Sequence, residues 1–179
     1  MRRFFRAYSF LIILSGTVII LDQITKYWVR ANIPLEGIWS PWPWLTPYAR
    51  LVHWYNTGVV FGLFQGKGDI FAVLAVIVSA AIIYYFPQIS SRDWALRIAL
   101  GLQLGGAIGN LIDRIMLGYV TDFISIWTFA VFNVADASIT IGVIVLIAGI
   151  IVEERRRQKL MKSHIEISSS AGSGEELAQ

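Results

Sequence analysis

The sequence predicts an all-α membrane protein with four transmembrane helices. Its 179 residues are 56% hydrophobic and only 15% charged, and the mean hydropathy is +0.61. These values are typical of a protein with several membrane spans and not of a soluble domain. In addition, four stretches are apolar over roughly the 20 residues that a helix needs to cross a bilayer. They are expected at about Ala7–Trp28, Asp69–Pro87, Trp94–Met116 and Asn133–Val152.

The first apolar stretch follows an arginine-rich start, as a signal peptide does. It continues into the charged sequence Asp22-Gln-Ile-Thr-Lys26 without a small-x-small cleavage site. We therefore interpret it as a retained first span. Because Asp22 and Lys26 are four residues apart, they are expected to form an ion pair on one face of the helix, with a structural role.

The segment between the first two spans, about 29–68, is too long for a simple connector and is expected to have structure of its own. The sequence WSPWPW, which begins at Trp39, cannot be helical. Its three tryptophans suit either the headgroup region of a membrane or a rigid loop packed on protein. Both interpretations stay open at this point.

Residues 51–64, LVHWYNTGVVFGLF, are rich in β-branched and aromatic side chains. This composition predicts short strands that form a small sheet at the membrane interface. His53 lies in this segment, and the only other histidine, His164, is expected on the opposite side of the membrane. We therefore expect a structural or interfacial histidine here and no metal site.

A short turn, Gln88–Asp93, makes the second and third spans antiparallel neighbours. The third span carries Gly101, Gly105, Gly106 and Gly109. Small residues at spacings of three and four let helix backbones approach closely, so this span is expected to pack tightly against its neighbours.

The basic residues predict the orientation. With both termini in the cytoplasm, ten of the 15 Lys and Arg residues lie outside the hydrocarbon on that side and five on the other, as the positive-inside rule requires. The polar motifs then all fall at the outer ends of their helices. The end of the chain, Ser168 to Gln179, is mainly Ser, Gly and Glu without apolar periodicity, and we predict a disordered cytoplasmic tail over 163–179. Residues 1–162 are therefore expected to form a single transmembrane domain.

The inventory of side chains restricts the chemistry. The chain has no cysteine, which excludes disulfides and thiol nucleophiles. Its two distant histidines cannot supply a zinc site or a serine–histidine triad. A serine–lysine pair is compatible with the composition, but no spacing links the candidates. Carboxylates remain as the candidate catalytic groups.

Two carboxylates stand out by position, because Asp122 follows the third span and Asp136 opens the fourth. An antiparallel helix pair can bring these side chains together. Two carboxylates within a few Å in a poorly solvated site share one proton, so that one can act as a base and the other as an acid. Such a pair can hydrolyse a peptide bond without a metal or cofactor.

Four further polar residues accompany this pair. Asn110 and Arg114 share one helical face, and Asn133 lies three residues before Asp136, so both sets can point into the same cavity. The amides can hold substrate backbone or the carboxylates, and the arginine can supply fixed positive charge. Asp113 is expected to be a structural ion-pair partner and not a catalytic group.

The sequence resembles bacterial lipoprotein signal peptidase (signal peptidase II) in five blocks, which occur in the family's order and with compatible spacing. The blocks are Asp22-Gln-Ile-Thr-Lys26, Asn56-Thr-Gly-Val-Val-Phe-Gly62, Gly105-Gly-Ala-Ile-Gly-Asn-Leu-Ile-Asp-Arg114, Val120-Thr-Asp-Phe123 and Phe132-Asn-Val-Ala-Asp136. The resemblance implies four transmembrane helices with a small external β-cradle and a short interfacial helix. Val59 and Ala137 depart from the family's usual residues, and the tail is longer than in many members, which bears on substrate contacts and not on the acid or base.

The resemblance also implies an activity, namely removal of the signal peptide from diacylglyceryl-modified prolipoproteins just before the lipidated cysteine. It implies a protein of the bacterial inner membrane that globomycin inhibits. The protein is expected to be a monomer that contacts membrane lipid and does not bind nucleic acid. By resemblance the catalytic residues are Asp122 and Asp136. The matching surrounding positions are Asp22, Lys26, Asn56, Gly58, Asn110, Arg114, Asn133 and Ala135.

Another class of function uses the same polar groups without catalysis. A small transporter subunit or assembly factor could employ them as an ion or proton path. Such a path predicts charges spread through the membrane depth, whereas here they gather at one edge and the second span has none between Asp69 and Arg92.

Overall fold

The computed structural model describes residues 2–58 and 66–176, with side chains given for 8–58, 66–158, 160 and 161. Its helices are α1 (Arg2–Asn32), α2 (Gly68–Tyr85) with the short 3-10 turn η2 (Phe86–Gln88), α3 (Trp94–Leu117) and α4 (Val134–Glu176). Each of the four α-helices contains a segment long and apolar enough to cross a membrane. The prediction of four spans is therefore confirmed.

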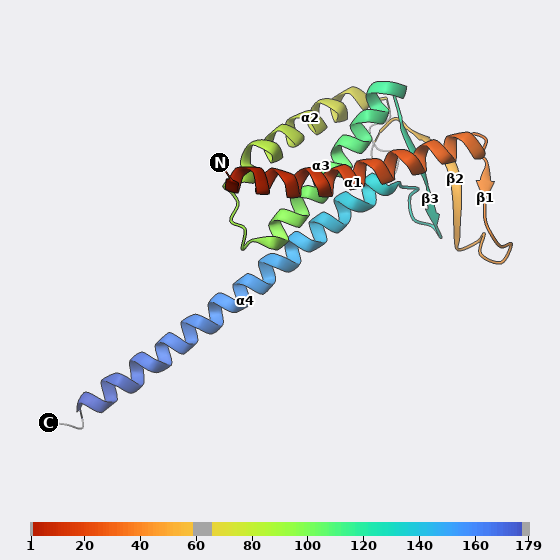
Figure 1. Ribbon diagram of the computed structural model, residues 1–179. Coiled ribbons are helices and arrows are strands. Elements are labelled where there is room, and N and C mark those ends of the chain that lie inside the picture. Colours follow the sequence, from red (N-terminus) through yellow and green to blue (C-terminus); the bar gives the residue numbers. More distant parts are fainter. Residues whose placement is uncertain (1, 59–65, 177–179) are drawn as a thin grey trace.

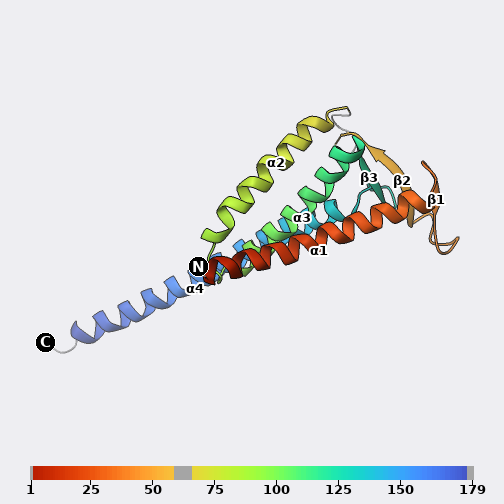
Figure 2. The same ribbon diagram turned by 45° about the horizontal axis from the view of Figure 1, so that its top comes forward.

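Helix α3 lies at the centre of the bundle and packs against α1, α2 and α4. The three strands gather at one end of the bundle, and both chain termini lie toward the other (Figure 1). Seen from a second direction, α2 diverges from α1 toward the sheet, where its start lies near the end of α3 (Figure 2).

Glycines allow the close helix packing that the sequence predicts. Gly105 and Gly109 face α1, and Gly106 faces α4. A Cβ atom at Gly105 would lie 2.6 Å from the Val18 side chain, and one at Gly109 would lie 2.7 Å from the Asp22 carboxylate. Both distances are too short for non-bonded atoms, so only glycine fits at these crossings.

A three-stranded antiparallel sheet lies at the end of the bundle, with the order β1 (Ile38–Trp39), β2 (Ala49–Asn56) and β3 (Val120–Ile126). The expected strands between residues 51 and 64 are confirmed by β2, and residues 59–65 lie outside the described part. The sequence analysis did not predict β3, which pairs with β2 so that Asp122 lies opposite Trp54. The sheet thus connects the segment after α1 to the segment after α3.

The short interfacial helix is not among the described elements. Between β1 and β2, residues 41–48 form hydrogen-bonded turns, in which Leu45 N donates to Trp42 O and Tyr48 N donates to Leu45 O. Three prolines in this stretch remove backbone donors, which favours turns over a regular helix.

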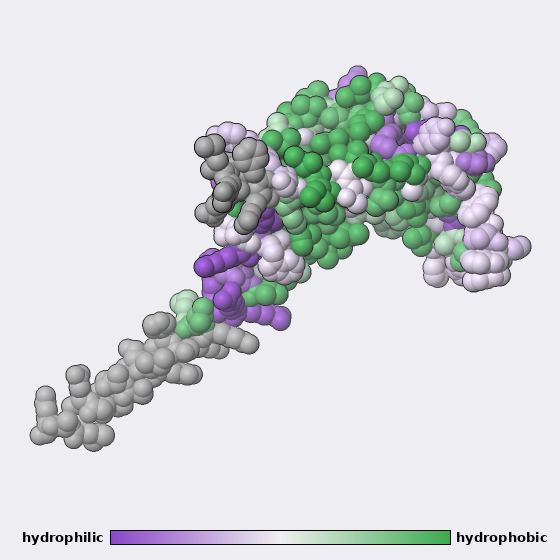
Figure 3. All heavy atoms as spheres, viewed as in Figure 1, coloured by the Kyte–Doolittle hydropathy of each residue, from purple (hydrophilic) through white to green (hydrophobic). Residues whose placement is uncertain are grey.

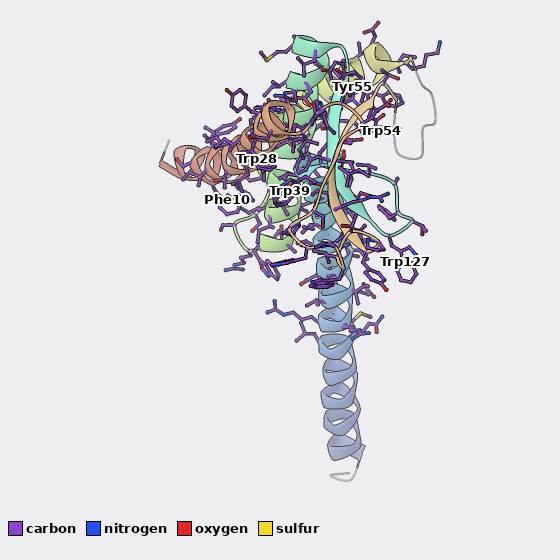
Figure 4. All side chains as sticks on the ribbon, turned by 90° about the vertical axis from the view of Figure 1, so that its right-hand side faces the viewer. Phe10, Trp28, Trp39, Trp54, Tyr55 and Trp127 are labelled. Carbon is purple, nitrogen blue, oxygen red and sulfur yellow. The ribbon has the colours of Figure 1, made fainter. Side chains whose placement is uncertain are left out.

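Aromatic side chains cover the outside of the sheet and the end of α1 (Figure 4). Trp54 is 50% exposed and Trp127 is 72% exposed, while Trp28 and Trp39 meet edge to face with ring centroids 5.9 Å apart. Large exposed aromatic rings next to apolar helices are typical of the membrane interface. This arrangement favours the interfacial interpretation of the tryptophan-rich segment.

Two further expectations concern His53 and the tail. His53 is buried, and its Nδ1 lies 2.8 Å from the Ile33 carbonyl, which agrees with a structural histidine. The structure continues α4 to Glu176, whereas the composition of 163–179 predicts disorder. The chain lacks a proline after Pro87 that would end the helix. The domain boundary near residue 162 stays a prediction.

Candidate active site

The first turn of α4 fixes Asp136. Asn133 lies directly before the helix, and its side-chain Oδ1 accepts a hydrogen bond from Asp136 N at 2.9 Å. In return, Asn133 N donates to Asp136 Oδ2 at 3.2 Å. These reciprocal bonds form a capping box, which satisfies backbone donors at the start of the helix. The Asn-x-x-Asp spacing therefore aims one carboxylate at the end of the bundle that carries the sheet.

Strand β3 holds the second carboxylate. Asp122 is only 2% exposed and accepts two side-chain hydrogen bonds. Asn133 Nδ2 donates to its Oδ1 at 2.7 Å, and Asn56 Nδ2, from the end of β2, donates to its Oδ2 at 2.7 Å. Asn133 thus contacts both carboxylates, so the structure brings Asp122 and Asp136 together as the sequence predicts.

Asn110 on α3 connects this pair to the bundle. Its Nδ2 donates to Asp136 Oδ1 at 2.8 Å. Its Oδ1 accepts from Asn133 Nδ2 at 3.1 Å and from Lys26 Nζ at 2.9 Å. Each oxygen of the two carboxylates therefore has an amide donor, and both carboxylates keep a fixed orientation.

A buried ion cluster lies behind the amides. Lys26 Nζ is 2.8 Å from Asp22 and 3.3 Å from Asp113, and all three side chains are at most 1% exposed. The expected Asp22–Lys26 pair is therefore confirmed. Asp113 also forms ion pairs, as expected, and its partners lie on α1. Among them is Arg30, whose Nη1 lies 3.7 Å away.

The two acidic residues of this ion cluster also hold the elements that carry the pair. Asp22 Oδ1 accepts from the backbone N of Ala135 at the start of α4, at 2.9 Å. Asp113 Oδ2 accepts from the backbone N of Thr121, next to Asp122, at 3.0 Å. The ion cluster thus fixes the positions of β3 and α4 relative to α1.

Arg114 lies at the edge of the site. Its Nη2 is 3.4 Å from the carbonyl oxygen of Gly58, and its guanidinium lies 5.8 Å from the centre of the Phe71 ring. It forms no direct bond to either carboxylate among the described residues, although its charge acts on both. Gly58 N in turn donates to Asn56 Oδ1 at 2.9 Å, and the rest of this block, 59–62, lies outside the described part.

The environment of Asp122 favours its protonated form. Burial raises the pKa of Asp122 to about 7, and the nearby charge of Asp136 adds to the increase. The two amide donors act in the opposite direction. Near neutral pH this carboxyl group is therefore about half protonated, which suits proton exchange with a substrate.

All of the predicted site residues that the structure describes lie in or directly beside this network. Sequence reasoning missed Gln23, Arg30 and Thr121, which add hydrogen bonds to the ion cluster. It predicted close helix packing at Gly109 but not that this glycine makes room for Asp22. The pattern VTDFISI, with its alternating β-branched residues, could have indicated β3 and thereby Thr121. Within the described side chains, no group of three His, Cys, Asp or Glu residues is arranged to hold a metal ion.

Comparison with known proteins supports a single family. The sequence model described as "Signal peptidase (SPase) II" matches residues 14–152. The lipoprotein signal peptidase of Moorella thermoacetica is 38% identical over 75% of this chain and 88% of its own length. That of Symbiobacterium thermophilum is 37% identical over 81% of this chain and 96% of its own length.

Solved structures agree with this result. A bacterial membrane enzyme determined by the in meso method at 2.3 Å resolution is 30% identical, with a TM-score of 0.74 over 80% of this chain and 88% of that one. A second, determined at 1.9 Å, is 31% identical with a TM-score of 0.69 over 78% of this chain and 91% of that one. The chain is thus a multi-pass membrane protein that belongs to the signal peptidase II family.

Proposed function

We propose that the protein is an aspartyl endopeptidase that removes the signal peptide from diacylglyceryl-modified prolipoproteins, cleaving before the lipidated cysteine. The observation that carries this proposal is the pair Asp122 and Asp136, whose four carboxylate oxygens are held by amide donors around Asn133. Family membership supports the reaction class, and the curated relatives carry the name lipoprotein signal peptidase.

In the proposed mechanism the two carboxyl groups share one proton. The ionised group removes a proton from a water molecule as the water attacks the scissile carbonyl carbon. The protonated group donates a hydrogen bond to the carbonyl oxygen, which then carries the developing negative charge. Collapse of the tetrahedral intermediate breaks the C–N bond, and the departing amine takes up a proton from the pair.

The asparagines keep both carboxylates in the orientation that this mechanism needs. Asn110, Asn133 and Asn56 all use their Nδ2 donors on Asp122 or Asp136, so substrate binding need not reorganise the pair. A pre-organised pair lowers the barrier because the polar groups are already aligned before reaction. Arg114, at the edge, is placed to stabilise negative charge on the substrate.

The location of the pair supports a lipid-anchored substrate. The site lies where apolar helices meet a sheet with exposed tryptophans, including Trp54 and Trp127. A diacylglyceryl group can stay in the bilayer there while the peptide reaches the carboxylates. An ion path through the membrane is less compatible, because the described part of α2 carries no charge after Asp69.

The reaction itself is the direct test. Purified protein, supplied with one diacylglyceryl-modified precursor, is expected to release the signal peptide, detected as a gel shift. Globomycin is expected to block this shift. The same precursor without its lipid is the control and is expected to stay intact. Equal cleavage of both precursors, or of neither, would contradict the proposed substrate class.

The proposed orientation places both termini in the cytoplasm and the carboxylate pair near the outer face of the inner membrane, in a monomer. The lack of cysteine makes a labelling test simple. Single cysteines at Ser40, beside β1, and at Ser91, between η2 and α3, are expected to react with an impermeant thiol reagent from opposite sides. Equal labelling of both from outside intact cells would contradict this orientation.

A further inference from the structure

A second polar region lies at the end of the bundle opposite the carboxylate pair. A groove of about 650 Å³ runs between the start of α3 and the middle of α4. Its volume is within the range of small-molecule binding sites, roughly 300–1,000 Å³. In the space-filling view, hydrophilic residues gather where α4 leaves the hydrophobic body of the protein (Figure 3).

The groove has an apolar part and a charged part. Trp94, Leu146 and Ile150 line the apolar part, and Arg92, Asp93 and Arg156 are among the residues of the charged part. From Leu146 to Arg156 the helix rises about 15 Å at roughly 1.5 Å per residue. A headgroup layer is about 6 Å thick on each side of the hydrocarbon. The groove is therefore long enough to contact both a lipid headgroup and the upper part of an acyl chain.

The charges in the groove are of both signs. Arg157 is paired with Glu153 at 3.5 Å, and Glu154 accepts a hydrogen bond from Gln158 at 3.0 Å. The side chains of Arg92, Arg156 and Asp93 also line the groove and make no ion pair among the described residues. Two guanidinium groups and one carboxylate are thus available to a ligand.

We propose that this groove binds an amine-bearing zwitterionic phospholipid from the leaflet opposite the carboxylate pair. The guanidinium groups of Arg92 and Arg156 bind the phosphodiester, and the carboxylate of Asp93 accepts hydrogen bonds from the primary ammonium group. The acyl chain lies along Trp94 and Ile150.

Charge complementarity selects this occupant. Arginine binds phosphate oxygens through paired N–H donors, so two arginines suit one phosphodiester. The groove also contains three carboxylates, from Asp93, Glu153 and Glu154, which match its three arginines in number. A lining of zero net charge favours a neutral headgroup with separated charges over an anionic one.

Native mass spectrometry of the full chain in detergent micelles tests this proposal. Dioleoyl phosphatidylethanolamine is expected to stay bound, and phosphatidylglycerol and phosphatidylcholine, with the same chains, are expected to bind at least about tenfold more weakly. Phosphatidylcholine keeps the net charge but cannot donate hydrogen bonds from its quaternary nitrogen. Glycerophosphoethanolamine, which lacks acyl chains, is expected to show no binding, because the apolar part of the groove then contributes nothing.

Variants locate the lipid in the groove. The double variant Arg92→Gln/Arg156→Gln is expected to bind phosphatidylethanolamine at least about tenfold more weakly, since charge-assisted hydrogen bonds are lost. Arg155→Gln is the matched control, because Arg155 is exposed nearby but does not line the groove, and its affinity is expected to stay unchanged. Ile150→Trp, at a side chain 61% exposed, is expected to fill the apolar part and weaken binding without affecting folding.

Three results would overturn the proposal. They are equal phosphatidylethanolamine binding by the wild type and the double variant, binding of phosphatidylglycerol as tight as that of phosphatidylethanolamine, and tight binding of glycerophosphoethanolamine alone. None of them bears on the proposed peptidase reaction, because the groove lies at the other end of the bundle.

Discussion

Replacing Asp122 with asparagine is expected to make the protein more stable at neutral pH and less stable in acid. The pKa of Asp122 rises from 3.8 to about 7 on folding, mainly because the side chain is buried and partly because of the charge of Asp136. A folded state with a raised carboxyl pKa prefers the protonated form. The wild-type protein therefore keeps its full stability below about pH 4. It loses stability as the pH rises through about 7, because the buried carboxyl group of Asp122 then ionises.

The size of this effect follows from the shift. The rise of the Asp122 pKa from 3.8 to about 7, at roughly 1.4 kcal/mol per pKa unit, lowers the free energy of unfolding of the wild type by about 4 kcal/mol between pH 4 and pH 8. An asparagine at position 122 cannot accept from both Asn56 and Asn133, because one of its own atoms is an N–H donor, and this costs about 1 kcal/mol. Asp122→Asn is thus expected to be about 3 kcal/mol more stable than the wild type at pH 8 and about 1 kcal/mol less stable in acid.

The assay is unfolding by SDS in mixed micelles, followed by tryptophan fluorescence at intervals from pH 4 to pH 8. Asp69→Asn, at an exposed carboxylate in the first turn of α2, controls for the loss of one negative charge. Parallel curves for the wild type and Asp122→Asn across this range would refute the reasoning, because they would show that burial does not penalise the charge of Asp122.

Two further predictions concern the packing and the ion cluster around the pair. Gly109→Ala is expected to displace the Asp22 carboxylate, 2.7 Å from the new methyl group, and to lower both cleavage rate and melting temperature. Gly16→Ala, where a methyl group meets nothing within 4 Å, is expected to leave both intact or to stabilise the helix by up to about 1 kcal/mol, and equal melting of the two variants would contradict the packing argument. Lys26→Met is expected to cost about 3–5 kcal/mol, since Asp22 is left buried without a cation and Asp113 keeps only Arg30, at 3.7 Å. SDS unfolding measures this loss, and wild-type stability would show that Lys26 is not needed to balance their charges.

The membrane helices were predictable because a span depends mainly on local composition. Burial in hydrocarbon requires a continuous apolar helix, and the predicted starts of the second, third and fourth spans lie within one residue of the starts of α2, α3 and α4. The strand β3 was missed because a seven-residue strand depends on a distant partner. Its neighbour β2 is about 70 residues earlier in the chain, and a short apolar run alone does not identify that pairing.

The candidate site was predictable in its members but not in its connections. Asp122, Asp136, Asn110 and Asn133 were found from the positions of polar residues at the ends of apolar segments, whereas Asn56 came from the family resemblance. The Lys26–Asn110 hydrogen bond joins residues 84 positions apart, so spacing gives no information about it. The role of Asp113 was correct as an ion-pair partner, whereas its partners on α1 depend on how α1 packs against α3.

The most direct measurement of the central claim is the cleavage rate of a lipidated precursor by Asp122→Asn and by Asp136→Asn. If the two carboxylates share the acid and base steps, both variants lose at least about 10²–10⁴-fold in rate while they still insert in the membrane and fold. The Asp69→Asn control is expected to cleave at the wild-type rate. Cleavage at the wild-type rate by either Asp122→Asn or Asp136→Asn would contradict the proposed mechanism.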